Sequence, residues 1–371
     1  MDKKCDLTCR RNKVGGQAVI EGVMMKKGEE VSLAMRKEDG SVDVSKWSFI
    51  SVRTKHKWLN IPILRGVIGF IESLILSFGT LNKSTEVLEL EDDSAKKGKD
   101  TSDKKSGGGL TLMVSVISMI LGVALAVLLF MWLPGTLTSL LERLTGPINT
   151  YLKAAIEGVI KILVFIVYLL SVSFMKDIKR VFQYHGAEHK SIACYEAGME
   201  LTPENAEKCT RFHPRCGTSF MFVMLLIGII SGMFIPVWDN MFLRAAIKLS
   251  IFPLVVGIGY EFIMFAGKHD NVVTRILSAP GLWMQRITTK EPDRTQLAIA
   301  ISAIKSSMPE EFPDFDPHTY DIDVEDNRAH VAFTGMKKSE IEERIAKIKA
   351  DKAKVSDQNE EMPDHVDEND A

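Results

Sequence analysis

The sequence has little cysteine and no apolar leader segment. Its five cysteines are Cys5, Cys9, Cys194, Cys209 and Cys216. All five fall in segments that the charge pattern assigns to the cytoplasm, where thiols stay reduced, so disulfides are a poor explanation for them. The first thirty residues are polar up to Val14 and lack the apolar core of a signal peptide. We therefore expect no cleaved secretory leader.

The chain also has no large excess of charge of either sign. Its 371 residues carry a formal net charge of −2, which says little by itself because the charges are strongly segregated along the chain. We expect no nucleic-acid partner. Its composition, 46% hydrophobic and 25% charged, is that of an ordinary soluble protein. This average is misleading, because the hydrophobic residues are concentrated in a few segments.

Charge is nearly missing from four long segments, which lie in the ranges 110–175 and 220–267. They are Leu110–Leu133, Ile156–Met175, Phe220–Val237 and Phe242–Gly267. A helix needs roughly 20 apolar residues to cross the hydrocarbon core, and a spanning backbone must satisfy its own hydrogen bonds. The sequence therefore predicts a mainly α polytopic membrane protein with about four transmembrane helices and the lipid bilayer as a partner.

The lysine and arginine residues between the predicted helices indicate which side of the membrane each connecting segment faces. The segment 176–219 is rich in lysine and arginine, whereas the connection between the first two helices carries only Arg143 and Lys153. Because cytoplasmic loops hold the excess of basic residues, we predict that segment 176–219 is a cytoplasmic loop. An even number of spans then places both termini in the cytoplasm.

Two segments before the first long helix are interpreted separately. Residues 1–58 are predicted to form a small cytoplasmic β-rich unit with a hairpin at Asp39-Gly40. Gly15-Gly16 favours a turn, with a close approach of the backbone to another group as the alternative. Residues 59–81 are long enough to cross the membrane, but Arg65 and Glu72 lie seven apart on one helical face. We predict an amphipathic or re-entrant helix there, because a fifth span would move the N-terminus outside.

Three further segments complete the predicted organisation. Residues 82–109 are charged and rich in glycine and serine, which is typical of a flexible linker. Residues 268–308 are predicted to form membrane-proximal helices, one of them an amphipathic helix over Thr295–Met308 that follows the start signal Pro292-Asp293. Residues 309–371 are expected to be an acidic, mostly disordered tail.

The stretch YHGAEHKSIACYE, residues 184–196, carries the first candidate site. If residues 178–197 are helical and end at Gly198, His185 and His189 project from one face, one turn apart. Two such imidazoles can bind one metal ion. The pattern also matches H-x-x-E-H, the reversed zinc-protease motif, in which Glu188 would act as the general base on metal-bound water.

A second cluster, RFHPRCGT at residues 211–218, lies in the same predicted loop. We expect His213 and Cys216 to join His185 and His189 as ligands of one divalent metal ion, with zinc the favoured metal. Four further candidates are Glu196, Arg211, Arg215 and Glu261. The arginines could hold an anionic substrate group or, as an alternative for the whole loop, lipid headgroups. Glu261 lies inside an apolar segment, and a salt bridge to Arg65 is the equal alternative to a site role.

Several of these stretches resemble one family. They are GGQAVIEGVMM (15–25), RGV (65–67), YHGAEHKSIACYEAG (184–198), RFHPRCGTSF (211–220) and TTKEPD (288–293). Together they are similar to the bacterial YqhQ-like membrane family, which is of unknown function and described as a predicted metal-dependent enzyme. The resemblance covers most of residues 14–305. It implies a multi-pass protein of the bacterial cytoplasmic membrane that depends on a metal ion, and it assigns no substrate.

Two hypotheses of function follow. The first is a membrane-embedded metal-dependent hydrolase that acts on a lipid or peptide at the cytoplasmic face of the membrane. The second is a non-enzymatic scaffold or assembly factor with a structural metal or none, whose partner proteins the sequence does not identify. Transport is less favoured, because the sequence has no evident inverted repeat.

Overall fold

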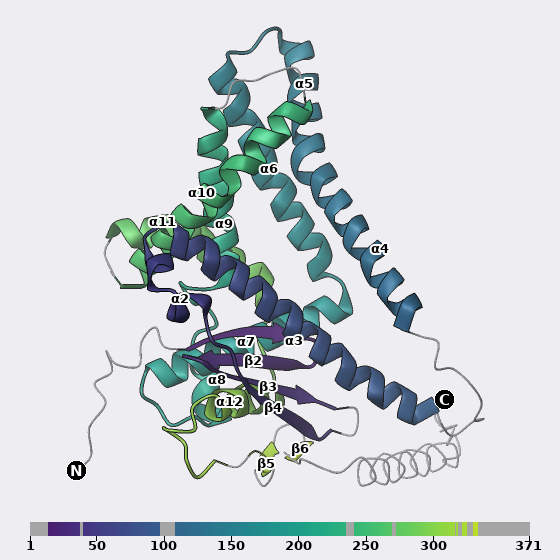
Figure 1. Cartoon of the computed structure of the whole chain (residues 1–371), viewed down its shortest axis with the longest axis vertical. Coiled ribbons are helices and arrows are strands. Elements are labelled where there is room, and N and C mark those ends of the chain that lie inside the picture. The colour runs from purple at the N-terminus through teal and green to yellow at the C-terminus, as the bar shows by residue number, and fades with distance from the viewer. Residues whose placement is uncertain are drawn as a thin grey trace, which may run out of the picture.

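The computed structural model describes residues 14–37, 40–96, 108–234, 241–268, 272–315, 317, 321–324 and 329–332. Long helices form one end of the molecule and a four-stranded sheet with its covering helices forms the other (Figure 1). We call the first part the helical bundle (α4–α6, α9 and α10) and the second part the sheet domain (β1–β4, α7, α8 and α12). The mainly α prediction with a small N-terminal sheet is confirmed.

The sheet is an antiparallel meander in the order β1-β2-β3-β4. Its strands are Val14–Val19, Gly22–Lys27, Glu30–Arg36 and Val42–Ser48. The register pairs Val23 with Ala34 and Leu33 with Ser45. Gly15 and Gly16 lie within β1, so the turn predicted for them is wrong; the first turn is formed by Ile20 and Glu21 instead.

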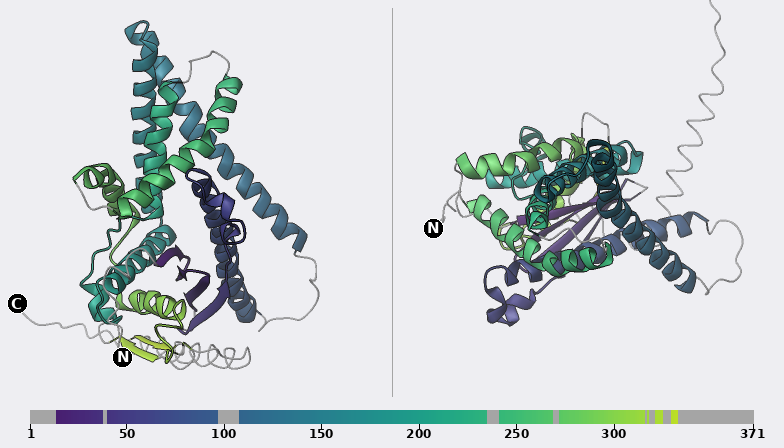
Figure 2. Two further views of the ribbon diagram at one scale, coloured as in Figure 1. Left: turned by 60° about the vertical axis from the view of Figure 1, so that its left-hand side comes forward. Right: turned by 90° about the horizontal axis from the view of Figure 1, so that it is seen from above.

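The sheet is the middle of three layers, as the two further views show (Figure 2). Alternate residues of a strand point to opposite faces. Val23 and Met25 pack against α7 (Lys176–Glu196) and α12 (Arg294–Ser306), whereas Met24 and Leu33 pack on the side of α3. Both faces of this small sheet are therefore covered by helices.

Helix α12 differs most from its prediction. Its start is the expected one, since Asp293 and Gln296 form a reciprocal capping box. The helix is not amphipathic, however, because every residue from Thr295 to Ile304 is buried. It is enclosed by β2, β3, α7 and the short helix α8 (Pro203–Glu207). By contrast, α11 (Val272–Thr288) packs directly beneath the bundle, against α9 and α6.

The bundle contains α4 (Gly108–Val127), a π-helical segment η2 (Leu128–Trp132), α5 (Leu133–Thr145), α6 (Thr150–Ser173), α9 (Gly217–Met233) and α10 (Met241–Lys268). The first predicted span ended at Leu133, but the helix continues to Thr145. Arg143 therefore lies on a helix, and so does Lys153. A helix that continues through the hydrocarbon keeps its backbone hydrogen bonds satisfied. The connection between α5 and α6 is therefore only Gly146–Asn149.

Four helical segments are long and apolar enough to cross a membrane within the described residues: Leu64–Thr85, Ile120–Thr145, Thr150–Ser173 and Ala246–Ala266. The number agrees with the prediction, but the members differ. The third predicted span, α9, has only 17 residues, whereas α3 qualifies by length and composition. These helices are compatible with a multi-pass membrane protein.

Helix α3 (Leu64–Lys96) follows two short elements, α2 (Val52–Lys55) and η1 (Lys57–Asn60). It continues through Lys96, so the flexible linker predicted over 82–109 is wrong for 82–96; residues 97–107 lie outside the described part. Leu76 packs against the sheet, and Ser84 Oγ donates to the Ile20 carbonyl at 3.2 Å. The helix also exposes an apolar stripe, Ile71, Leu74, Ile75 and Phe78, which suits the interfacial position predicted for residues 59–81.

The tail contains one element that was not expected. Strands β5 (Asp321–Val324) and β6 (Ala329–Ala332) pair antiparallel. Most of the tail predicted to be disordered lies outside the described residues, as do Cys5 and Cys9 near the N-terminus.

Gly186 provides a test of how the sheet domain is assembled. A Cβ at this position would lie 2.0 Å from the Lys290 carbonyl oxygen, a backbone atom held in place because the Lys290 N–H donates to the Phe182 carbonyl. We expect Gly186→Ala to destabilise the protein by about 1–3 kcal/mol through overpacking. Thermal unfolding of the detergent-purified protein measures the loss. Gly79→Ala in α3 is the matched control, since a Cβ there meets nothing within 4 Å, and equal stability of the two variants would contradict the close packing.

Candidate metal centre

The candidate site lies where the sheet domain meets the bundle. Helix α7 spans Lys176–Glu196, and Gly198 follows it with a φ of +70°, the left-handed geometry expected of a helix stop. His185 and His189 project from one face of α7, with ring centroids 4.4 Å apart. His189 is buried and His185 is half-buried. The helical spacing predicted from the sequence is therefore present.

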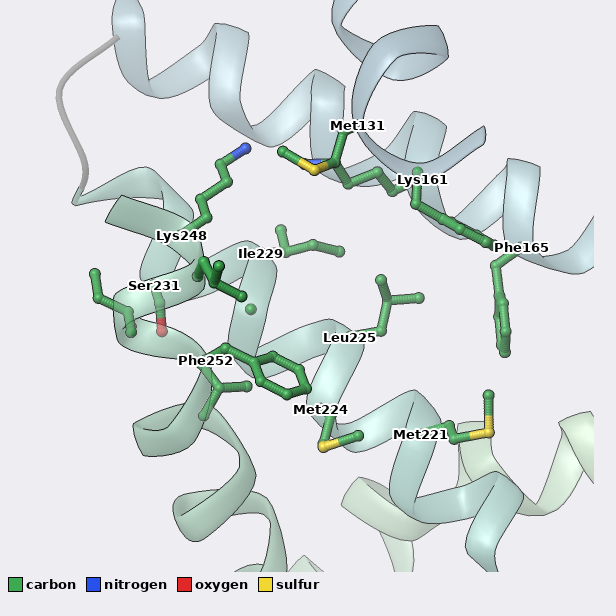
Figure 3. A pocket seen from close by; sticks show the side chains of 15 residues that line it. Met131, Lys161, Phe165, Met221, Met224, Leu225, Ile229, Ser231, Lys248 and Phe252 are labelled. Atoms are coloured by element: carbon green, nitrogen blue, oxygen red, sulfur yellow. The ribbon is translucent and has the colours of Figure 1, made fainter. Parts of the chain in front are cut away.

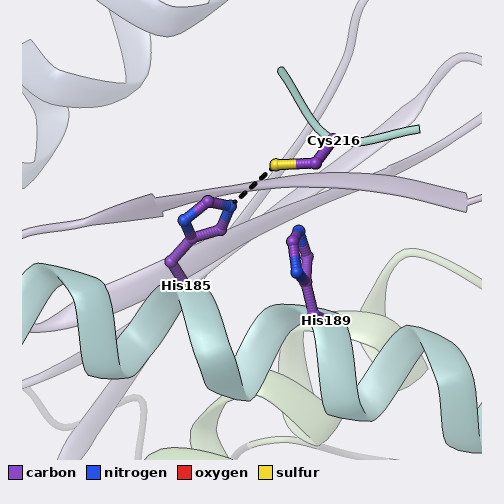
Figure 4. Close-up of side chains that lie close together, drawn as sticks. All are labelled: His185, His189 and Cys216. Carbon is purple, nitrogen blue, oxygen red and sulfur yellow. Dashed lines mark hydrogen bonds between the residues drawn. The ribbon is translucent and has the colours of Figure 1, made fainter. Parts of the chain in front are cut away.

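Cys216 comes to these histidines from the bundle. It is the N-cap residue of α9, and its Sγ lies 3.2 Å from His185 Nε2 (Figure 4). One ligand atom each from His185, His189 and Cys216 lie within 4.8 Å of one another. Tetrahedral zinc with bonds of 2.0–2.3 Å needs ligand atoms roughly 3.4–3.8 Å apart. The three residues thus fit a small divalent ion, and the helix N-terminus favours the negative charge of a thiolate ligand.

Two backbone carbonyls orient the imidazoles. His185 Nδ1 donates to the Thr288 carbonyl at 2.9 Å, and His189 Nδ1 donates to the Arg211 carbonyl at 2.5 Å. A carbonyl can only accept, so in both rings Nε2 keeps its lone pair for a metal. If Cys216 were instead a nucleophile activated by a histidine, one such imidazole would be enough as its base. Two rings fixed in the same way could bind one metal ion together.

His213, the fourth predicted ligand, lies beside this group but is not part of it. Its ring centroid is 5.6 Å from that of His189. Its Nε2 lies 3.2 Å from an Arg215 Nη and 3.6 Å from a Glu196 carboxylate oxygen. Gln285 of α11 fixes its backbone, accepting from the His213 N–H at 2.8 Å and donating to the His213 carbonyl at 2.7 Å. Burial lowers the pKa of His213, which favours the neutral imidazole.

Glu188, the predicted general base, is buried between α7 and the first strand of the sheet. A Cβ on Gly16 would lie 2.8 Å from Glu188 Cγ, so only glycine lets the strand approach this closely. Burial raises the pKa of Glu188 to about 7, and the nearby His185 works in the opposite direction. The sequence offered such a close backbone approach as the alternative to a turn at Gly15-Gly16, and at Gly16 the structure has it.

The remaining predicted residues form ion pairs. Arg215 pairs with Glu196, and Arg211 pairs with Glu291, which also accepts from Lys190 at 2.8 Å. These pairs compete with the predicted role of the arginines as anion holders. Glu261 pairs with Arg65, with Nε 2.6 Å from Oε1, so the salt-bridge alternative holds and Glu261 does not join the site.

Sequence reasoning missed the residues that support the ligands. Thr288 and Glu291 belong to the TTKEPD stretch, and Gln285 precedes it on α11. Gln285 Nε2 also donates to Ser219 Oγ on α9 at 2.8 Å. Polar residues in an apolar membrane-proximal helix were the signal that could have indicated this role.

Comparison with known proteins gives two matches. The family model described as "Protein of unknown function (DUF1385)" matches residues 61–310. The "Uncharacterized protein YqhQ" of Bacillus subtilis (strain 168) is 36% identical over 302 residues, which cover 79% of this chain and 92% of that protein. No solved structure matches.

Metal content tests the ligand assignment. We expect purified protein to hold about one divalent ion per chain, and His185→Ala, His189→Ala and Cys216→Ala to reduce this content at least about tenfold, since each removes one of three ligands. Elemental analysis by mass spectrometry measures it. His213→Ala is the discriminating control, because the structure places it outside the ligand group and its variant should keep the ion. Loss of metal from His213→Ala at unchanged folding would show that His213 is a ligand after all.

Proposed function

We propose that this chain, which belongs to the family described as "Protein of unknown function (DUF1385)", is a membrane-embedded metal-dependent hydrolase. The observation that carries the proposal is the convergence of three ligand residues, His185, His189 and Cys216, within 4.8 Å. Structural zinc sites use four protein ligands, whereas catalytic sites use three and leave one position for water or substrate. Three ligands are therefore the number that catalysis requires.

Each residue of the site has its own role in the proposed reaction. The carbonyls of Thr288 and Arg211 hold both imidazoles in the coordinating orientation. A divalent ion bound there would polarise a substrate oxygen and acidify a water molecule. Glu188 follows the order of the H-x-x-E-H motif and adjoins His189, so its carboxylate is the group we assign to accept the proton of the attacking water.

The position of the site suggests its substrate class. Cys216 caps α9, the helix that enters the bundle, and α11 packs beneath the same helix. The site thus lies at the level where the bundle ends and the sheet domain begins. A lipid or a peptide at the membrane surface could reach it there, which is the substrate class that we propose.

A second function is favoured by one specific feature. The ligands come from both parts of the molecule, His185 and His189 from the sheet domain and Cys216 from the bundle. A metal ion at this junction would also connect the two parts as a structural link. In that case the protein would be a scaffold or assembly factor without catalytic activity.

Two variants separate the functions. If the protein is a hydrolase, Glu188→Gln should keep the metal and the fold but reduce turnover by about 10²–10⁴-fold, the usual contribution of a general base. His189→Ala should lose both metal and activity. The assay would use protein reconstituted in vesicles of extracted bacterial lipids, with a peptide mixture added, and products identified by mass spectrometry.

The controls decide between the hydrolase and the scaffold. Products that form equally with wild type and Glu188→Gln would argue against the base, and no products with metal-loaded wild type would favour the scaffold. A scaffold should instead show a lower unfolding temperature for His189→Ala and an unchanged one for Glu188→Gln.

We further propose that the sheet domain and both termini lie in the cytoplasm of a bacterial cell. The basic residues of segment 176–219 support this orientation. It places the Gly146–Asn149 connection outside the membrane on the opposite side.

Cysteine labelling in intact cells tests the orientation. Leu144 at the far end of α5 is 77% exposed, and Lys46 on β4 is exposed. Leu144→Cys should react with a membrane-impermeant maleimide from outside, whereas Lys46→Cys should react only after the membrane is opened. The reverse pattern would invert the proposed topology.

A further inference from the structure

The short segment before α3 projects where the bundle meets the sheet domain. It comprises α2 and η1 with their flanking residues, 50–63, and we call it the α2–η1 segment. Figure 1 shows α2 between the sheet and α11. Five large apolar side chains of the segment are exposed, with Trp58 the most exposed at 68%; they are Ile50, Val52, Trp58, Ile61 and Ile63. Exposed apolar side chains gathered on one short segment mark an interaction surface.

The same segment carries positive charge that no acidic residue balances. Lys55 and Lys57 are exposed, and within the part of the chain that the structure describes neither forms an ion pair. Two lysines in the bundle differ in this respect. Lys161 and Lys248 line an apolar pocket (Figure 3) and both contact the buried Glu157, with Nζ–Oε1 distances of 2.7 Å and 3.3 Å. The ammonium groups of the α2–η1 segment are therefore available to an acidic partner outside the chain.

Glu72 of α3 holds the first end of the α2–η1 segment. Its carboxylate accepts from Ser51 Oγ at 2.9 Å and from the Val52 N–H at 2.7 Å. It also lies 3.6 Å from Arg53 Nε. The carboxylate of Glu72 is thus used by the start of α2 and by the arginine, which agrees with the lack of an ion pair at Lys55.

Ile63 holds the other end in an unusual conformation. Its φ is +68°, which a β-branched residue rarely adopts. The Ile63 N–H donates to Glu261 Oε1 at 3.3 Å, and a Cβ on Gly257 of α10 would lie 2.8 Å from the Ile63 carbonyl oxygen. A strained residue persists only where the surrounding structure holds it. Both ends of the segment are therefore fixed, to α3 and to α10, so the exposure of its side chains is a property of the fold.

Helix α11 presents a second surface of similar composition beneath the bundle. It exposes Ile276 and Trp283, and Arg286 is exposed as well. The three positions share one helical face, and Arg286 forms no ion pair with any residue that the structure describes. Tryptophan together with basic residues is typical of the boundary between membrane and water. This helix and the α2–η1 segment thus indicate the same level of the molecule as that boundary.

We propose that the α2–η1 segment docks on acidic phospholipids at the bilayer surface, with Lys55 and Lys57 at the lipid phosphates and Trp58 and Ile61 among the upper acyl chains. Basic residues close to an anionic leaflet are attracted to it, and an indole ring has the apolar body and polar edge that suit this depth. The segment is held by α3 and α10, which are long and apolar enough to cross a membrane. A bilayer is therefore the partner that this surface meets first, and the proposal is independent of the proposed hydrolase.

Lipid competition tests the headgroup preference of the detergent-purified full chain. Native mass spectrometry would count the phosphatidylglycerol and the phosphatidylcholine, of identical acyl chains, that stay bound from an equimolar mixture. We expect wild type to prefer phosphatidylglycerol, and Lys55→Gln/Lys57→Gln to lower this preference at least about fivefold.

A second double variant controls for the change of net charge. Lys46→Gln/Lys208→Gln removes two exposed lysines of the sheet domain, one on β4 and one at the end of α8. It should keep the preference of wild type. No preference in wild type, or an equal preference in the two double variants, overturns the proposal.

Tryptophan quenching tests the depth of the segment. The protein would be reconstituted in vesicles of phosphatidylglycerol brominated near the top of its acyl chains, where we expect Trp58 to be quenched. Trp58→Phe should then lower the quenchable fluorescence. Trp47→Phe should not, because Trp47 packs against the sheet and Lys83 lies over its ring. Unchanged quenching in Trp58→Phe would place the segment outside the bilayer and overturn the proposal in favour of a protein partner.

Discussion

Two hydrogen bonds, from His185 Nδ1 to the Thr288 carbonyl and from His189 Nδ1 to the Arg211 carbonyl, are the constraint on which the functional interpretation depends. They fix the orientation of both imidazoles, and they hold α7 against the two connections that lead to and from the bundle. The absence of a side chain at Gly186 lets the Lys290 carbonyl approach α7 at the same place. Without these contacts the two histidines would be surface residues on a helix with no common target.

The same contacts explain why a metal centre here would serve both catalysis and assembly. Cys216 belongs to the N-terminus of α9, and the histidines belong to a helix that packs on the sheet. Any ion held by all three would couple the position of the bundle to that of the sheet domain. Both proposed functions need the three ligand residues. Only the hydrolase needs Glu188 as a general base, so the role of Glu188 distinguishes the two functions.

The two residue clusters of the candidate site were visible in the sequence, because helical spacing places His185 and His189 on one face whatever surrounds them. The sheet, the apolar helices and the capped start of α12 follow from local patterns in the same way. Which member of the second cluster faces the histidines was not predictable. His213 and Cys216 are three residues apart, and in the structure Cys216 joins the histidine pair whereas the His213 side chain lies beside Arg215 and Glu196.

Other errors have the same origin. Apolar residues alone do not distinguish an amphipathic helix from one enclosed by a sheet and helices, so the amphipathic prediction for α12 was wrong. Glu261 could have been a site residue until Arg65 was seen to pair with it. The sequence by itself determined that the chain is mainly helical with a small N-terminal sheet, and which residue types gather in the candidate site, since these depend on neighbours along the chain. Only the tertiary structure decided which side chains share a space, because that depends on residues more than 100 positions apart meeting, as His185 and Thr288 do.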